Sequence, residues 1–133
     1  MDQIRPVLDF RHVVLLVDDD IAVRDSLKFT LEVAGFEVRA YGSAEQLLSE
    51  QFIPLTSCLV TDYQMPEMNG LELVTKLRER CVSVPAIIIT AQPDENFRNC
   101  AAEASITILE KPILGNRLFD SILNAFVEHW KSA

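Results

Sequence analysis

The chain has few basic residues, and none of its apolar runs is long. It carries 12 Lys and Arg residues against 20 Asp and Glu residues, which gives a formal net charge of -8. Because nucleic acids and anionic membranes are bound by neutralising phosphate with Lys and Arg, this balance argues against either partner. No stretch approaches the roughly 18 apolar residues of a membrane span, and residues 1–6 lack the apolar core of a signal peptide. We therefore expect a cytoplasmic protein that makes no membrane contact and does not bind nucleic acid directly.

Cysteine is also scarce. The three cysteines, Cys58, Cys81 and Cys100, are odd in number and far apart in the sequence. This pattern excludes a framework of disulfides and has no spacing typical of a metal site. We predict that these cysteines are buried, unreactive thiols.

The length of 133 residues and the apolar content of 49% are those of one domain with a single core. Apolar runs alternate with amphipathic stretches along the whole chain. We predict strands at 13–17, 36–41, 58–61, 86–89 and 106–109, and helices at about 21–34, 44–51, 70–80, 94–104 and 116–131. Five such βα units are typical of an α/β protein whose parallel sheet is covered by helices on both faces.

Local signals mark some of the boundaries of these elements. Gly35 can adopt the left-handed conformation that ends the first helix, and Ser43 with Gln46 forms a candidate capping box for the second. The last helix has apolar residues at roughly helical spacing, so we predict that it buries one stripe against the sheet. The residues of this predicted stripe are Leu118, Ile122, Leu123, Phe126, Val127 and Trp130.

Polar side chains close four of the five predicted strands. Asp18 and Asp19 follow the first strand, Asp62 the third, Thr90 the fourth and Lys111 the fifth. Right-handed crossovers bring the carboxyl ends of parallel strands to one edge of the sheet, which is where ligands bind in such folds. We therefore expect these five side chains to lie close together.

Three carboxylates gathered in this way would repel one another. A pair of them 4 Å apart repels by about 4 kcal/mol at an effective dielectric constant of 20. A cation would relieve the repulsion, and Mg²⁺ fits because it commonly uses one or two carboxylates together with water and phosphate oxygens. Lys111 and Thr90 add an ammonium and a hydroxyl that are suited to binding phosphate.

These residues stand in motifs that resemble the receiver domain of two-component response regulators, most of all receivers that precede a helix-turn-helix output domain. The resemblance covers roughly residues 11–130. It is carried by Leu16-Val17-Asp18-Asp19-Asp20, Val60-Thr61-Asp62-Tyr63-Gln64-Met65-Pro66, Asn69-Gly70, Ile88-Ile89-Thr90-Ala91 and Glu110-Lys111-Pro112. It implies a doubly wound, flavodoxin-like (βα)5 fold with strand order 2-1-3-4-5. The receiver would span residues 11–131, with residues 1–10 as an N-terminal extension.

The resemblance also implies a chemistry for the strand ends. Asp62 would accept a phosphoryl group from a sensor histidine kinase or a phosphotransfer protein. Asp18, Asp19, Asp62 and the main-chain carbonyl of Gln64 would hold Mg²⁺, and Thr90 with Lys111 would bind the phosphoryl oxygens. The chain would catalyse only its own phosphorylation and dephosphorylation, so it would not be an enzyme for other substrates.

Further implications concern the lifetime and the use of the phosphoryl group. Gln64 and Gln92 occupy positions at which family members adjust phosphoryl lifetime by admitting or blocking water. The counterpart of Thr90 moves on phosphorylation and changes the surface formed by helix four, strand five and helix five. This surface would control an output, which we expect to be transcription, and could also form a homodimer. The resemblance further implies a cis peptide between Lys111 and Pro112.

The chain departs from the family pattern in two places. Ile108 stands where the family usually has the aromatic residue that completes the switch, and Glu103-Ala104-Ser105 stands where a glycine is common. The coupling could therefore be altered, weak, or carried by helix four alone. We interpret Asp20 as the solvated start of the first helix in preference to a third acid of the metal site.

Two other functions are compatible with parts of this pattern. A small phosphohydrolase resembling the haloacid dehalogenases would use Asp18 as nucleophile and Asp20 as general acid, but it would leave Asp62 without a role, and no acidic pair follows Lys111. An interaction module with the same fold but no phosphorylation is the second alternative, which the missing aromatic at Ile108 keeps open.

Overall fold

The computed structural model describes residues 12–132, so the N-terminal extension predicted for residues 1–10 lies outside the described residues. All five predicted βα units are present. In chain order they are β1 (Val13–Val17), α2 (Ile21–Val33), β2 (Glu37–Tyr41), α3 (Ala44–Leu48), β3 (Ser57–Asp62), α4 (Gly70–Glu79), β4 (Ala86–Thr90), α5 (Glu95–Glu103), β5 (Thr107–Glu110) and α6 (Arg117–Ser132). The largest difference from the predicted bounds is in α3, which ends at Leu48 instead of at about residue 51.

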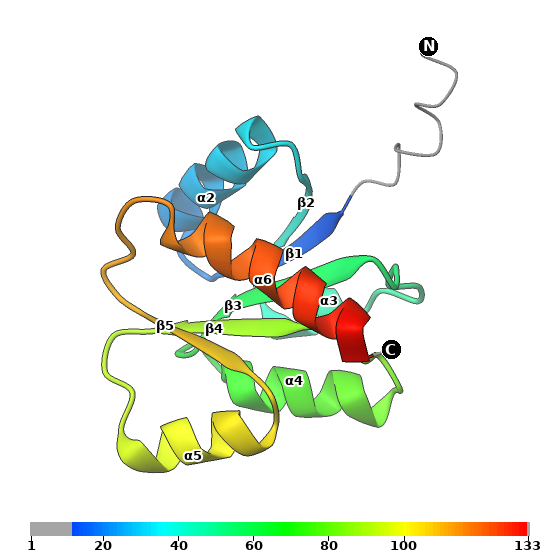
Figure 1. Ribbon diagram of the computed structural model, residues 1–133, viewed down its shortest axis with the longest axis vertical. Coiled ribbons are helices and arrows are strands. Elements are labelled where there is room, and N and C mark those ends of the chain that lie inside the picture. Colours follow the sequence, from blue (N-terminus) through cyan, green and yellow to red (C-terminus); the bar gives the residue numbers. More distant parts are fainter. Residues whose placement is uncertain (1–11, 133) are drawn as a thin grey trace.

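The five strands form one parallel sheet in the order β2-β1-β3-β4-β5, which confirms the predicted fold class and strand order. Helices α2 and α6 cover one face of this sheet, and α3, α4 and α5 cover the other (Figure 1). All five residues of β1 are buried because successive side chains point to opposite faces and both faces are covered. Val14 and Leu16 join the core under α2 and α6, whereas Val13, Leu15 and Val17 join the core under the other three helices.

Helix ends follow local chemistry. Gly35 has φ +108° directly after α2, and the next residue, Phe36, donates a main-chain hydrogen bond back to Leu31, as in a glycine-terminated helix. The capping box predicted at α3 is only half present. Ser43 accepts from Gln46 N at 3.2 Å, but the Gln46 side-chain oxygen accepts from Gly42 N at 2.8 Å instead of from Ser43.

Part of the apolar stripe predicted for α6 is wrong. Leu118, Ile122 and Phe126 are buried, but Leu123 is 39% exposed and Val127 is 51% exposed. Each residue of a helix is rotated by about 100° from the one before, so Leu123 and Val127 lie beyond the stripe that faces the sheet. The side chain of Trp130, the last residue of the predicted stripe, lies outside the described residues.

The cysteine prediction is correct for Cys58 and wrong for the other two. Cys58 is buried in β3, and this burial raises the pKa of its thiol to about 12. Cys81 is exposed in the turn after α4, where its φ is +64°, and Cys100 is exposed on α5 beside the buried Ala101. In both places the chain turns the side chain away from the sheet, which a count of cysteines could not reveal.

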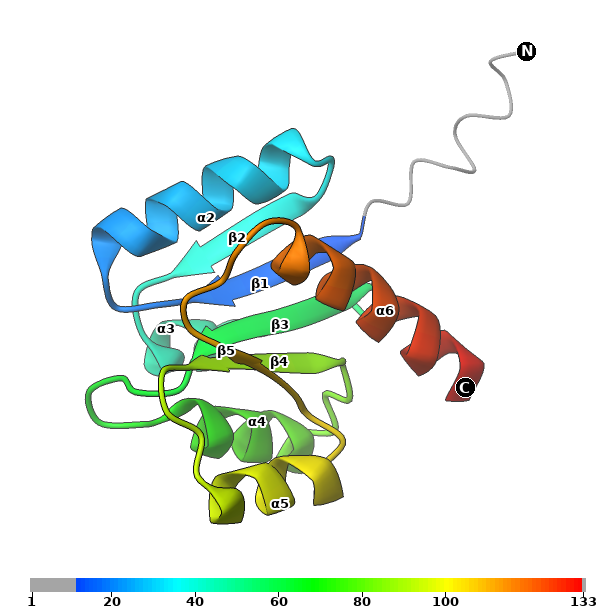
Figure 2. The same cartoon turned by 60° about the vertical axis from the view of Figure 1, so that its left-hand side comes forward.

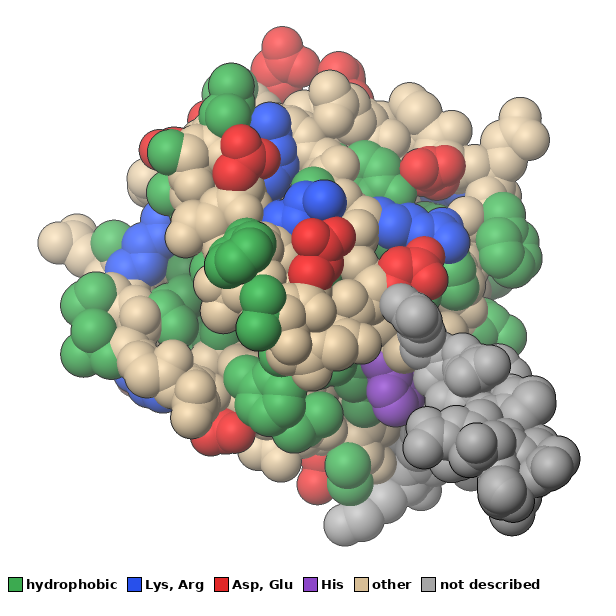
Figure 3. Space-filling model, turned by 90° about the horizontal axis from the view of Figure 1, so that it is seen from above, with side chains coloured by type: hydrophobic (Ala, Val, Ile, Leu, Met, Phe, Trp, Pro, Cys, Tyr) green, Lys and Arg blue, Asp and Glu red, His purple; other side chains and the backbone are tan. Residues whose placement is uncertain are grey.

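The surface carries charges of both signs. On the face shown in Figure 3, basic side chains lie next to acidic ones and do not gather into one basic patch. None of the helices in the part of the chain that the structure describes has the length and apolar character needed to cross a membrane.

Candidate functional site

The carboxyl ends of the strands lie at one edge of the sheet (Figure 2). Asp62 is the last residue of β3 and Thr90 the last residue of β4, while Asp18 and Lys111 directly follow β1 and β5. The register aligns Val17 with Thr61 and pairs Thr90 with Glu110, so the four side chains start from neighbouring positions along the edge. The structure thus brings these predicted residues to one place.

Asp62 and Lys111 form an ion pair, with 2.7 Å between Oδ1 of the carboxylate and Nζ of the ammonium. The Asp62 side chain is 10% exposed and the Lys111 side chain 45% exposed. Within the described residues, Oδ1 is buried and accepts no other hydrogen bond of regular geometry. The hydrogen bond to Asp62, followed by the negative charges of Asp62, Asp18 and Asp19, raises the pKa of Lys111. Lys111 therefore stays protonated and balances part of the acidic charge.

A main-chain hydrogen bond holds Lys111 next to the end of β4. Its N–H donates to the carbonyl of Thr90 at 2.8 Å, and the peptide bond between Lys111 and Pro112 is cis, as predicted. Thr90 is itself buried at the end of β4. The hydroxyl and the ammonium therefore lie on adjacent strands beside Asp62.

Asp18 is held firmly and is almost fully buried. Its N–H donates to the Tyr41 carbonyl at 3.1 Å, its Oδ1 accepts from Asp20 N at 2.9 Å, and its carbonyl accepts from Nη1 of Arg24 at 2.7 Å. Burial raises the pKa of Asp18, and the negative charges of Asp62 and Asp19 raise it further. Asp18 therefore lies within electrostatic reach of both other acids.

Arg24 was missed in the sequence analysis, although its position in the first turns of the helix after the acid pair could have drawn attention to it. Asp19 and Asp20 are exposed. Asp20 is the N-cap of α2, where its side chain accepts from Val23 N at 3.2 Å, so its interpretation as the helix start is confirmed.

A small hollow of about 180 Å³ lies over the Asp62–Lys111 pair. Its lining residues are Asp62, Tyr63, Gln64, Thr90, Ala91, Gln92 and Lys111. Gln64 and Gln92 are exposed and border this hollow together. Ile108 does not line it; this residue is half-buried on β5 and packs against the core under α3, α4 and α5.

The three predicted carboxylates do not form a preformed cage. Within residues 12–132, no group of three or more acidic, His or Cys side chains is close enough to hold a metal ion by itself. This differs from the close cluster expected from the sequence, and the exposure of Asp19 gives the reason: a carboxylate that can reach water lowers the repulsion by staying solvated.

The remaining donors still fit Mg²⁺. Asp18 and Asp62 are buried carboxylates at adjacent strand ends, and the charge of Asp62 raises the pKa of Asp18. Among residues 12–132, the polar partner of Asp62 Oδ1 is Lys111. Two carboxylates with one ammonium leave a negative balance, which a hard cation with oxygen ligands would neutralise. Asp19 directly follows Asp18, and Gln64 lies two residues after Asp62. The Asp19 carboxylate and the Gln64 carbonyl could therefore complete the coordination shell of the ion together with water.

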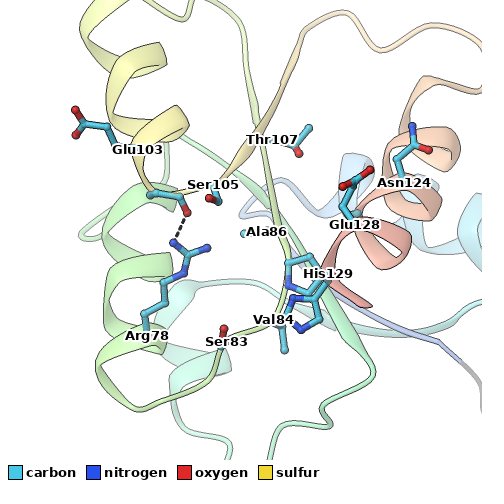
Figure 4. A pocket seen from close by; sticks show the side chains of 13 residues that line it. Arg78, Ser83, Val84, Ala86, Glu103, Ser105, Thr107, Asn124, Glu128 and His129 are labelled. Carbon is cyan, nitrogen blue, oxygen red and sulfur yellow. Dashed lines mark hydrogen bonds between the residues drawn. The ribbon is translucent and has the colours of Figure 1, made fainter. Parts of the chain in front are cut away.

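A second and larger hollow, of about 740 Å³, lies at the other end of the sheet (Figure 4). It includes Ala86 and Thr107, the first residues of β4 and β5, together with residues of α6. On its rim Arg78 donates a hydrogen bond to the carbonyl of Ala104. None of the predicted site residues lines this hollow, so the small hollow at the carboxyl ends is the candidate site.

Comparisons with known proteins agree with this assignment. A family model described as the response regulator receiver domain matches residues 14–123. Nodulation protein W of Bradyrhizobium diazoefficiens is 34% identical over 114 residues, which cover 85% of this chain and 50% of that protein. Transcriptional regulatory protein FixJ of Rhizobium meliloti is 35% identical over 115 residues, which cover 86% of this chain and 56% of that protein.

Solved structures give the same result. The crystal structure of FixJ-N superposes with a TM-score of 0.78 and 34% sequence identity, covering 86% of this chain and 93% of that chain. The chain spans about half the length of the two curated relatives named above.

Proposed function

Because the chain belongs to the response regulator receiver domain family, we propose that Asp62 accepts a phosphoryl group from a phosphohistidine on a sensor histidine kinase or a phosphotransfer protein. The observation that carries this proposal is the ion pair between Asp62 and Lys111, 2.7 Å apart in a hollow that Thr90 also lines. A carboxylate beside a fixed ammonium and a hydroxyl is suited to receive a phosphoryl group, because both donors can bind the oxygens that arrive with it. Proteins of this family are signal transducers and not enzymes that act on separate substrates.

In the proposed reaction an oxygen of Asp62 forms a bond to phosphorus while the bond from phosphorus to the imidazole nitrogen breaks. The electron pair of that bond stays with the imidazole, which then takes up a proton. Lys111 and Thr90 hold the phosphoryl oxygens in line, and positioning and charge neutralisation supply most of the catalysis. Water later attacks phosphorus, releasing phosphate and restoring the carboxylate.

Asp18, Asp19, Asp62 and the main-chain carbonyl of Gln64 would hold Mg²⁺ in this scheme. When bound, the ion would neutralise charge on the phosphoryl oxygens. The burial of Asp18 and Asp62 supports this assignment, since an unbalanced buried carboxylate is costly. Gln64 and Gln92, which border the small hollow, are placed to control the entry of water and hence the lifetime of the phosphoryl group.

The output of the phosphorylated state is also a proposal. We assign residues 11–131 to the receiver and residues 1–10 to an extension, and we infer that the surface formed by α5, β5 and α6 changes when Thr90 moves toward the phosphoryl group. Ile108 in β5 has no ring to rotate, so this strand alone is a weak relay. The surface would control transcription, since the relative FixJ is a transcriptional regulatory protein, and could pair two copies of the chain.

Mass spectrometry after incubation with Mg²⁺ and acetyl phosphate tests the proposal. We expect the mass of one phosphoryl group on Asp62, lost on standing and absent from Asp62→Asn. Addition at Asp18 with rapid turnover of phosphoesters would instead indicate a phosphohydrolase. A parent chain that remains unmodified while the same treatment labels a known receiver would overturn the proposal in favour of an interaction module.

A further inference from the structure

Arg24 reaches back from the first turns of α2 to the loop that carries the acid pair, where its Nη1 donates to the carbonyl of Asp18 at 2.7 Å. We propose that Arg24 is a positioning residue that fixes the loop between β1 and α2, so that the carboxylates of Asp18 and Asp19 are held ready for Mg²⁺. This inference rests on the proposed function, because it concerns the cation that the phosphoryl transfer would use.

Other hydrogen bonds also restrain this loop, among them the two that Asp20 accepts, from Val23 N at 3.2 Å and from Arg24 N at 2.9 Å. On the side of β2, the N–H of Asp18 donates to the Tyr41 carbonyl at 3.1 Å. On the side of α2, Oδ1 of Asp18 accepts from Asp20 N at 2.9 Å. The carbonyl of Asp18, which belongs to the peptide unit joining Asp18 to Asp19, accepts the hydrogen bond from Arg24. Loss of this bond would free the peptide unit that joins the two acids, and would thereby change the direction of both side chains.

A glycine on the neighbouring loop leaves room for the guanidinium. A Cβ atom added to Gly42 would lie 3.2 Å from Nη1 of Arg24 and 3.7 Å from its Cζ. The φ of Gly42 is outside the left-handed region, so the effect of a side chain there would come from space: a Cβ atom would be in tight contact with the guanidinium, which would have to shift by a few tenths of an ångström. Gly42 is held in turn, because its N–H donates to Oε1 of Gln46 at 2.8 Å. Arg24 is therefore fitted between the loop after β1 and the loop after β2.

What the structure shows of Arg24 at this loop is a hydrogen bond to the main chain, from Nη1 to the carbonyl of Asp18. In metal sites generally, partners that orient a ligand change metal affinity by about 10- to 100-fold when they are removed. A positioning arginine should therefore be visible in the affinity for Mg²⁺ itself, without any measurement of phosphorylation.

Calorimetric titration with Mg²⁺ in the absence of any phosphoryl donor tests the inference. We expect Arg24→Ala to raise the Kd for Mg²⁺ about tenfold or more. Lys28→Ala is a matched control, because it removes one positive charge from the same helix and breaks only an exposed ion pair with Glu32. Its Kd should stay within about twofold of the parent value. Arg24→Ala with a parental Kd would overturn the inference.

Gly42→Ala provides a second route that leaves the arginine in place. Its added methyl group should displace the guanidinium and raise the Kd by a smaller factor, about two- to fivefold. Combined with Arg24→Ala, the same substitution should have no further effect, because the group that it displaces is gone. Full additivity of the two effects would show that Gly42 acts independently, and would count against the arrangement proposed here.

General loss of stability must be separated from loss of positioning. Leu31→Val weakens the buried face of α2 without contact to the loop, so it should lower the urea midpoint while the Kd for Mg²⁺ stays parental. An equal loss of affinity in Leu31→Val and Arg24→Ala would overturn the inference. If the parent itself does not bind Mg²⁺, the metal-dependent function fails together with the inference. If the parent binds Mg²⁺ and Arg24→Ala binds it with the same Kd, the inference about Arg24 is wrong while the proposed function stands.

Discussion

The ring of Tyr63, the residue after Asp62, packs against the ring of Phe97 in α5, with the ring centroids 4.6 Å apart and the planes inclined by 58°. Tyr63 also lines the small hollow over Asp62, and Phe97 is buried in the core under α5. The pair thus joins the candidate phosphorylation site to the helix whose surface is proposed to change. Ile108 stands where the family usually has an aromatic residue on β5, and the contact between Tyr63 and Phe97 was not predicted from the sequence.

We expect Phe97→Leu to leave phosphorylation of Asp62 unchanged but to reduce its effect on α5. The substitution keeps an apolar side chain and removes the ring. Hydrogen exchange of amides 95–103, with and without acetyl phosphate and Mg²⁺, should show a phosphorylation-dependent change in the parent and about half of it or less in the variant. Phe119→Leu is the control, since it removes a ring from the Phe36–Phe119 pair on the opposite face. A full response in Phe97→Leu would rule out this relay.

The ion pair between Lys111 and Asp62 should contribute to stability even without phosphorylation. Because the Lys111 side chain is 45% exposed, solvent screens the pair, and we expect a coupling energy of about 1 kcal/mol, less than the 3–5 kcal/mol cost of breaking a fully buried pair. A double-mutant cycle with Lys111→Met and Asp62→Asn, measured by urea unfolding, gives this energy. A coupling energy near zero would contradict the ion pair.

The same pair predicts a dependence on alkaline pH. The folded chain holds the Lys111 proton to a higher pH than the unfolded chain, whose pKa has the ordinary value of 10.5. Its contribution is therefore complete below pH 10.5 and is lost as pH rises through the higher folded pKa. Lys111→Met should therefore lose less free energy of unfolding than the parent as the pH rises above 10.5, which urea unfolding at several alkaline pH values would measure.

The charge of Asp18 should lower the stability of the folded chain, whereas the charge of Lys111 raises it. The unfolded chain releases the Asp18 proton near the ordinary pKa of 3.8, whereas burial keeps the proton on the folded chain to a higher pH. Between these values the folded state gains protons relative to the unfolded state, so stability falls as pH rises above 3.8. Asp18→Asn keeps an acceptor for the N–H of Asp20 and removes the charge. We expect it to be more stable than the parent at neutral pH by on the order of 1 kcal/mol, because it removes a buried charge and the repulsion of that charge from Asp62 and Asp19.

This difference should shrink when Mg²⁺ is added to the parent or when the pH is lowered toward about 4, because either change removes the cost of the Asp18 charge. Urea unfolding at both pH values, with and without Mg²⁺, measures it. A less stable Asp18→Asn at neutral pH in the absence of Mg²⁺ would contradict the burial of a costly charge.

Ser105 occupies a position that favours glycine. It follows α5 with φ +58°, a conformation in which a side chain costs roughly 1–2 kcal/mol. Ser105→Gly should therefore raise the free energy of unfolding by about 0.5–1 kcal/mol, after allowing for the greater freedom of glycine in the unfolded chain. Ser83→Gly is the control, because Ser83 borders the same large hollow without a positive φ and should lose stability. Equal effects of the two substitutions would rule out relief of strain.

Thiol reactivity distinguishes the three cysteines. A thiol reagent should modify Cys81 and Cys100 rapidly in the folded protein, since both are exposed. Cys58 is buried, with its thiol pKa raised to about 12, so it should react only when the chain unfolds. Mass spectrometry of the folded protein should therefore find two labels, and three labels at neutral pH without denaturant would show that β3 opens readily.

The predictions that differ from the structure concern features that depend on neighbouring groups in the folded chain. The capping box predicted at α3 is half correct, because the Gln46 side-chain oxygen accepts a hydrogen bond from the N–H of Gly42 and not from that of Ser43. Leu123, Val127 and Cys100 were assigned to the interior from residue type, yet exposure on a helix depends on which side of the helix faces the sheet. Cys81 was assigned in the same way and is exposed in the turn after α4. Asp19 lies within electrostatic reach of Asp18, as expected, but its side chain is also exposed to water, which was not predicted.

The order of strands and helices, the parallel sheet and the residues at its carboxyl edge could all be predicted from the amino-acid sequence. Apolar periodicity fixes the elements, and the handedness of the crossovers brings Asp62, Thr90 and Lys111 to one edge wherever the loops run. The contacts that support these residues became visible in the folded chain and could not be predicted. The hydrogen bond of Arg24 to Asp18, the space left by Gly42 and the packing of Tyr63 on Phe97 join segments through their relative orientation. Such orientation depends on how whole elements pack, and short-range patterns in the chain do not record it.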